Sequence, residues 1–121
     1  MLKYKDLTKE QKKHVCNGCG GKGGIIKPPS FIFQASCNHH DFLYWRGRAE
    51  ADKIRADDNF YSWMKEDIKL KPWYKKPHYH IWAYAYYKFV WLGGDKYFNY
   101  ADKPKDIDDL NREMLYEKNK V

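Results

Sequence analysis

The sequence predicts an all-α protein in which long helices are separated by breaks rich in glycine and proline. Apolar residues recur three and four positions apart over much of the chain, whereas the alternation that marks half-buried strands is rare. The length of 121 residues and the hydrophobic content of 43% are sufficient to form one modest core. We therefore expect a single domain that spans residues 1–121.

The first third of the chain combines a short helix with an irregular segment. Residues 1–15 are mostly polar and favour an N-terminal helix that begins at about residue 4. The segment CNGCGGKGGIIKPPS, residues 16–30, contains five glycines and two prolines, which predicts a loop. Ser30 can cap a helix that begins near Phe31 and continues to about Arg46.

The middle of the chain favours a second long helix from about Ala51 to Lys69. Its apolar stripe has helical spacing and consists of Ile54, Tyr61, Met64 and Ile68. Asp57 falls within this stripe, so its carboxylate is expected to face the core and to need a partner there. The neighbouring Asp58 can turn to water.

Two more helices complete the predicted fold. The segment KPWYKKPHYH, residues 71–80, contains two prolines and indicates a connection. The helix after it ends at Gly93 and Gly94, and its apolar stripe consists of Ala83, Tyr86, Tyr87, Val90 and Trp91. The core helices therefore occupy residues 31–94. The remaining residues, 95–121, contain a helix from about Ile107 to Lys118 that is charged on most faces.

The charge of the chain restricts the kind of partner that we expect. The 23 basic residues outnumber the 16 acidic residues, and the net charge of +7 favours phosphate, either in nucleic acid or in anionic lipid headgroups. No apolar run has the length of a signal peptide or a membrane span. We expect a cytoplasmic protein or one released by a non-classical route, or a secreted protein if a signal was removed.

One face of the predicted helix over residues 31–46 carries residues suited to chemistry. Cys37, His40, Asp41 and Tyr44 are spaced i, i+3, i+4 and i+7, whereas His39 points elsewhere. A buried Asp57 against His40 would orient the imidazole and stabilise its charged form, as in the orienter and base of a hydrolytic site. Asp41 can bind a hard cation together with carbonyl groups of the glycine-rich loop.

These residues resemble a known family. The pattern C-x-x-H-D-x-x-Y, formed by Cys37, His40, Asp41 and Tyr44, is similar to the active-site helix of the secreted phospholipase A2 superfamily. The sequence NGC…FQASCNHHDFLYWR looks especially like that of its small bacterial and fungal branch. Two flanking segments extend the resemblance over about residues 17–94. Their matching residues are Arg55, Asp57, Phe60, Ala83, Tyr86, Tyr87 and Val90. The Leu-Gly-Gly that follows, residues 92–94, lies one position earlier than in the family pattern.

The resemblance implies a fold of long antiparallel helices and a calcium-dependent activity. His40 would be the general base, Asp57 its orienter, and Tyr44 a hydrogen-bonding anchor for Asp57. Asp41 and the backbone of Asn17 and Gly18 would bind Ca²⁺. A water activated by His40 would then attack the sn-2 ester of a phospholipid, with calcium stabilising the oxyanion.

The cysteines leave a different interpretation open. Their number is odd, so at most one internal disulfide forms, or the thiols bind metal. The family resemblance implies a bridge between Cys19 and Cys37. Alternatively, Cys16, Cys19, Cys37 and His40 have the spacing of a Cys3His zinc site, which would indicate a basic binding protein, with nucleic acid as partner. A catalytically inactive phospholipase A2-like binding protein lies between these two interpretations.

An aromatic run from Trp73 to Trp91 is interrupted by lysines. An enzyme that acts at an interface needs such residues to bind lipid, and Trp73, Tyr74 and Trp82 remain candidates after core packing is considered. We therefore expect a phospholipid membrane surface as partner, with a preference for anionic lipids.

Overall fold

A computed structural model of the protein describes residues 1–16 and 32–119. The helices of these residues are α1 (Lys9–Val15), α2 (Gln34–Arg46), α3 (Glu50–Lys69), α4 (Lys76–Gly93) and α5 (Ile107–Asn119), with 3-10 turns η1 (Tyr4–Asp6) and η2 (Gly94–Lys96). Within the described residues there is no strand, and the only β-type pairing is an isolated bridge between Arg48 and Tyr100. The predicted all-α class is therefore confirmed.

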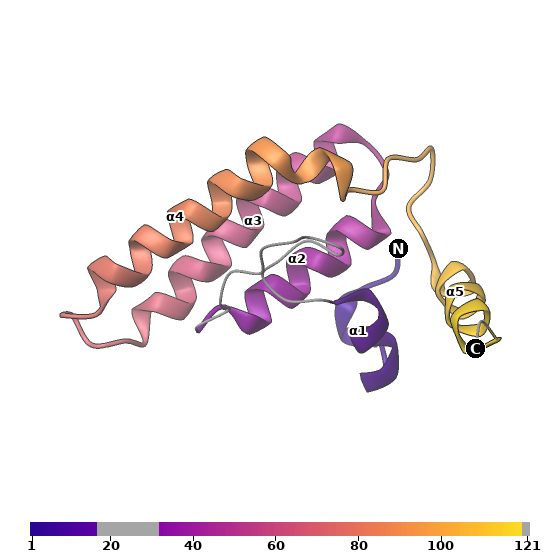
Figure 1. Ribbon diagram of the computed structural model, residues 1–121, viewed down its shortest axis with the longest axis horizontal. Helices are drawn as coiled ribbons and strands as arrows, with labels where there is room; N and C mark the ends of the chain where they lie inside the picture. Colours follow the sequence, from indigo (N-terminus) through magenta and orange to yellow (C-terminus); the bar gives the residue numbers. More distant parts are fainter. Residues whose placement is uncertain (17–31, 120–121) are drawn as a thin grey trace.

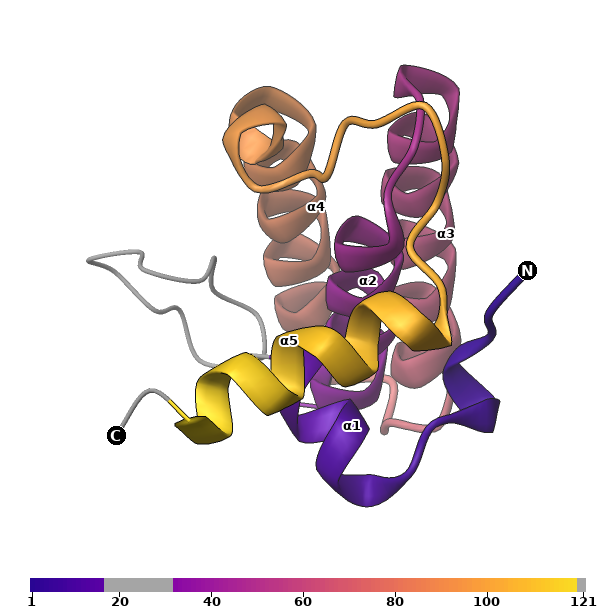
Figure 2. The same ribbon diagram turned by 90° about the vertical axis from the view of Figure 1, so that its right-hand side faces the viewer.

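Three helices form the main body of the protein. Figure 1 shows α3 and α4 as a long antiparallel pair, with α2 lying along α3. Figure 2 shows α5 crossing in front of α2, next to α1. This arrangement leaves α2 enclosed by helices on several sides, so polar residues on its inner face are removed from water.

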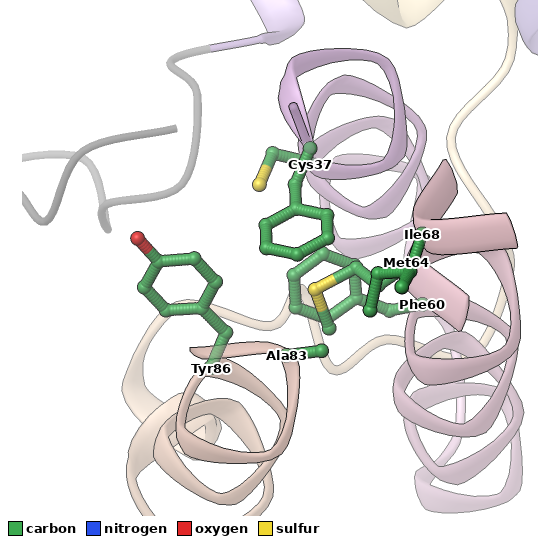
Figure 3. Packing of buried hydrophobic residues seen from close by; sticks show 7 residues of the cluster. Cys37, Phe60, Met64, Ile68, Ala83 and Tyr86 are labelled. Carbon is green, nitrogen blue, oxygen red and sulfur yellow. The ribbon is translucent and has the colours of Figure 1, made fainter. Parts of the chain in front are cut away.

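The main core lies between α2, α3 and α4. Its buried residues, most of which are labelled in Figure 3, are Phe33, Cys37, Phe60, Met64, Ile68, Ala83 and Tyr86. A second cluster joins α1, α2 and α5 through Leu7, Val15, Phe42 and Leu110. Because α2 contributes to both clusters, its position is fixed on two sides.

Helix α2 begins three residues later than predicted. Phe33 occupies the N-cap position without a side-chain capping bond, and the predicted cap, Ser30, lies outside the described residues. The ring of Phe33 is buried and makes edge contacts with Tyr79 and Tyr86 of α4, at centroid distances of 6.2 and 5.9 Å. Packing against α4, rather than a capping side chain, therefore accompanies the observed start of the helix.

The buried face of α3 keeps Met64 and Ile68 of the predicted stripe but includes Ala56 and Phe60, while Tyr61 is only partly buried. Ile54 is 46% exposed, whereas its neighbour Lys53 is buried. Lys53 lies one turn before Asp57, so burial on the same face lets the ammonium group reach the carboxylate. The prediction that Asp57 is buried and Asp58 faces water is confirmed.

Helix α4 is longer than predicted and exposes more of its surface. It begins at Lys76, inside the segment expected to be a connection, with Pro77 in the first turn, where the missing N–H has no helical partner to lose. Ala83 and Tyr86 are buried as predicted, but Trp91 is about half exposed. The ammonium group of Lys88 lies over the Trp91 ring, 4.8 Å from its centroid.

Candidate functional site

The candidate site lies between the facing surfaces of α2 and α3. His40 is in the middle of α2, and Asp57 is in the first half of α3; both side chains are buried, and Asp57 is 0% exposed. The two helices pack directly against each other. The sequence patterns placed both residues on inward faces, and the packing brings those faces together.

The three residues predicted to be catalytic form one hydrogen-bonded group. His40 Nε2 lies 2.8 Å from Asp57 Oδ1, and the Tyr44 hydroxyl donates to the same oxygen at 2.6 Å. A carboxylate can only accept, so Nε2 carries the proton and Nδ1 has the lone pair. Within the described residues no hydrogen bond to Nδ1 is found, so this is the ring nitrogen that could accept a proton.

Lys53 is a member of the group that the sequence analysis missed. Its ammonium group donates to Asp57 Oδ2 at 2.8 Å and to the carbonyl oxygen of Val90 at 3.2 Å. A second carboxylate, that of the exposed Asp95, lies 3.8 Å away. The spacing i, i+4 between Lys53 and Asp57 was the available signal, because oppositely charged side chains at this spacing meet on a helix.

Asp57 is held in its charged form. Burial alone would raise the pKa of this carboxyl group, but hydrogen bonds from His40, Lys53 and Tyr44 outweigh burial and lower it. Burial and the negative charge of Asp57 raise the pKa of Tyr44, so its hydroxyl remains a donor. At neutral pH the group therefore contains a carboxylate, an ammonium ion and a neutral phenol.

His40 is held in its neutral form. Burial lowers the pKa of the imidazole below its usual 6.5, Asp57 opposes this change, and the positive charge of Lys53 adds to it. The ring packs against Tyr44 and Phe60 with centroid distances of 4.1 and 4.5 Å. The imidazole is consequently fixed in orientation and able to accept a proton at neutral pH.

A close backbone approach supports Tyr44. Gly94, at the end of α4, lies so near that a Cβ atom there would overlap the Tyr44 hydroxyl, whereas a Cβ at Gly93 would meet nothing within 4 Å. The ring of Tyr44 also makes an edge contact with Phe98 at 5.2 Å. The end of α4 thus helps to define where the hydroxyl points.

The predicted calcium ligands are only partly within the described residues. Asp41 is half-buried on α2. The pKa of the Cys16 thiol is raised to about 12, first by the burial of the thiol and second by the negative charge of Asp41. Its carboxylate is therefore near the residue that directly precedes Asn17. Asn17 and Gly18 lie outside the described residues, and the ion site remains a prediction.

The residues of the predicted zinc site have other partners where they are described. Cys16 is a free thiol whose Sγ donates to the Asn38 carbonyl at 3.2 Å, and Cys37 is disulfide-bonded. Cys19 lies outside the described residues. Within residues 1–16 and 32–119, no three His, Cys, Asp or Glu side chains are grouped so that they could hold a metal. Zinc binding by this set would require Cys37 to leave its disulfide, whereas His40 could offer Nδ1 and keep its bond to Asp57.

His39 is separate from the site, as predicted. Its ring lies against Tyr4 at 4.5 Å and is stacked on Trp63 at 4.8 Å. It is therefore on a different side of α2 from His40, and the two neighbouring histidines provide a natural comparison for substitutions.

Comparison of the chain with protein families, with curated proteins and with solved structures finds no match. None of the helices in the described ranges is long and apolar enough to cross a membrane. A function is therefore inferred from the chemistry of the His40 site and from the resemblance of the sequence around it.

Proposed function

We propose that this protein is a calcium-dependent hydrolase of the secreted phospholipase A2 type, which cleaves the sn-2 ester of phospholipids. The observation that carries the proposal is the buried hydrogen bond of 2.8 Å between His40 Nε2 and Asp57, which leaves Nδ1 as a proton acceptor. Asp41 and Tyr44 complete the family motif on the same helix. A purely structural histidine would need the same acceptor for its buried N–H, so the two roles are distinguished by fatty-acid release.

His40 acts on water in the proposed reaction. As the water oxygen forms a bond to the ester carbonyl carbon, one water proton moves to Nδ1 of His40. The resulting imidazolium is stabilised by the carboxylate of Asp57. When the tetrahedral intermediate collapses, the C–O bond to the lysophospholipid breaks, and the proton on Nδ1 passes to the departing alkoxide. The products are a fatty acid and a lysophospholipid, His40 returns to its neutral form, and no covalent bond to the enzyme is formed.

Lys53 and Tyr44 adjust the strength of this base. Tyr44 donates to the Asp57 oxygen that also binds His40, and Lys53 neutralises the other oxygen. Both contacts reduce the negative charge that Asp57 presents to the imidazole, so His40 stays neutral until it receives a proton from water. This makes the resting state the reactive state near pH 7.

Asp41 is the described residue that fits a calcium ion. A carboxylate oxygen is a hard donor suited to Ca²⁺, and Asp41 lies near Cys16, which leads into the loop of Asn17 and Gly18. Asp41 and the backbone of these two residues would hold the ion. When bound, Ca²⁺ would supply positive charge at the oxyanion of the ester.

The test is fatty-acid release from mixed phospholipid vesicles with and without added calcium. His40→Asn should reduce the calcium-dependent rate by roughly 10²-fold or more, because it removes the general base. His39→Asn is the matched control, since the same change is made one residue away on another side of α2. The proposal is wrong if the native chain releases no fatty acid, or if both substitutions have the same effect.

A further inference from the structure

The connection between α3 and α4 exposes large apolar side chains at one end of the molecule. Leu70, Trp73 and Tyr74 are 89%, 82% and 63% exposed. Figure 1 shows that this connection lies at the far end of the α3–α4 pair, where the chain reverses. We refer to residues 69–76 as the α3–α4 tip. Three such side chains within five residues form an apolar surface that the other described residues do not cover.

The α3–α4 tip is held in a defined shape. The backbone N–H of Lys71 donates to the carbonyl of Ile68 at 2.9 Å, and that of Lys75 donates to the carbonyl of Pro72 at 3.0 Å. The rings of Trp73 and Tyr74 meet edge to face at 5.9 Å. These bonds fold the backbone of the tip into turns, on which the two aromatic rings lie in contact with each other.

The charges around the apolar side chains are positive. The tip contains four lysines: Lys69, Lys71, Lys75 and Lys76. The two carboxylates just before it, Glu66 and Asp67, reduce the local net charge from +4 to +2; Glu66 accepts from Lys69 at 2.8 Å and Asp67 from the neutral Ser36 at 2.6 Å. A partner of the tip must therefore combine an apolar layer with negative charge.

We propose that the α3–α4 tip docks on an anionic phospholipid bilayer. Tryptophan and tyrosine favour the boundary between the acyl chains and the headgroups, and lysine can extend its ammonium group to the phosphates. A second copy of the chain fits poorly, because its tip carries the same positive charge. Single-stranded nucleic acid would need a groove that follows its backbone, whereas the tip is a short reversal of the chain at the end of the molecule. The idea that the tip brings an enzyme to its substrate rests on the proposed function, whereas the proposal that the tip binds a bilayer does not.

The first experiment measures co-sedimentation of the full chain with phosphatidylcholine vesicles that contain or lack phosphatidylserine. Leu70→Ala/Tyr74→Ala should lower the partition coefficient by on the order of tenfold, because it removes apolar contact with the interface. Leu115→Ala/Tyr116→Ala is the matched control, since these residues of α5 are 59% and 73% exposed and the same atoms are removed. Circular dichroism verifies that both variants remain folded.

The second experiment tests the charge requirement. Lys71→Gln/Lys75→Gln should weaken binding to phosphatidylserine vesicles by roughly fivefold for each lysine. The same double change at Lys103 and Lys118, which are exposed and distant in sequence, should have a smaller effect. Added salt should reduce the difference, because exposed charges are screened.

The outcomes separate the docking proposal from the proposed hydrolysis. His40→Asn should bind vesicles as the native chain does, whereas Leu70→Ala/Tyr74→Ala should still hydrolyse a monomeric short-chain phospholipid. If the native chain hydrolyses nothing but binds anionic vesicles through the tip, the proposed function fails and the docking proposal stands.

Three results would overturn the docking proposal. The first is unchanged vesicle binding by Leu70→Ala/Tyr74→Ala, and the second is an equal loss in the α5 control. The third is that substitutions in the tip weaken binding of a single-stranded oligonucleotide but leave binding to vesicles unchanged.

Discussion

Asp57→Asn is expected to destabilise the protein by about 3 kcal/mol, independently of any catalytic role. The carboxylate of Asp57 is fully buried and contacts the ammonium group of Lys53, which is also buried. Asparagine keeps the shape of the side chain and one oxygen acceptor for His40 and Tyr44. It removes the negative charge, however, and leaves a buried ammonium ion without its counterion.

The magnitude follows from the contacts that Lys53 retains. Breaking a buried ion pair by removing one partner costs about 3–5 kcal/mol, because the remaining charge is uncompensated. Lys53 would keep the Val90 carbonyl at 3.2 Å and the exposed Asp95 at 3.8 Å, which offset part of this cost. The lower end of the range is therefore expected.

A double-mutant cycle makes the reasoning testable. Lys53→Met/Asp57→Asn removes both charges and fills a similar volume, so it should be more stable than Asp57→Asn, with a coupling free energy of about 2 kcal/mol. The assay is reversible urea unfolding at pH 7, followed by circular dichroism for the native chain, both single variants and the double variant. A cost below about 1 kcal/mol for Asp57→Asn, or strict additivity, would refute the buried ion pair.

Four further predictions follow from the same site. Because burial lowers the pKa of folded His40 below 6.5, the unfolded chain binds its proton first. The free energy of unfolding should therefore fall as the pH drops below about 6.5 towards the folded pKa, and unfolding curves of His40→Asn should lose this part of the pH dependence. Lys53→Met should move the NMR titration of the His40 ring to higher pH, because it removes a positive charge that lowers the pKa of His40; an unchanged midpoint would contradict that role of Lys53. Gly94→Ala should lower both stability and hydrolysis, because its Cβ would overlap the Tyr44 hydroxyl, whereas Gly93→Ala has open space; equal effects in urea unfolding and vesicle assays would count against this packing. A strong zinc chelator should leave the circular dichroism spectrum unchanged, and unfolding by the chelator would favour the zinc interpretation.

The sequence by itself determined the helical class and the main candidate residues. The three-to-four-residue spacing of apolar side chains predicted α3 to within one residue, because a helix must present one continuous apolar face to its core. The sequence also predicted that Asp57 lies within such a face and that His40 and Tyr44 share a face of another helix. Each of these is a property of one segment and does not depend on how the segments pack.

Only the tertiary structure decided which side chains at the edges of those faces are buried. Lys53 is buried and Ile54 is exposed, although hydrophobicity favours the opposite, because the carboxylate of Asp57 offers Lys53 a partner beside the Val90 carbonyl of α4. Helix α2 begins at Gln34 where Phe33 packs on α4, and Trp91 of α4 is left about half exposed. These outcomes depend on atoms brought together from separate helices, and a pattern within one segment contains no information about atoms in another.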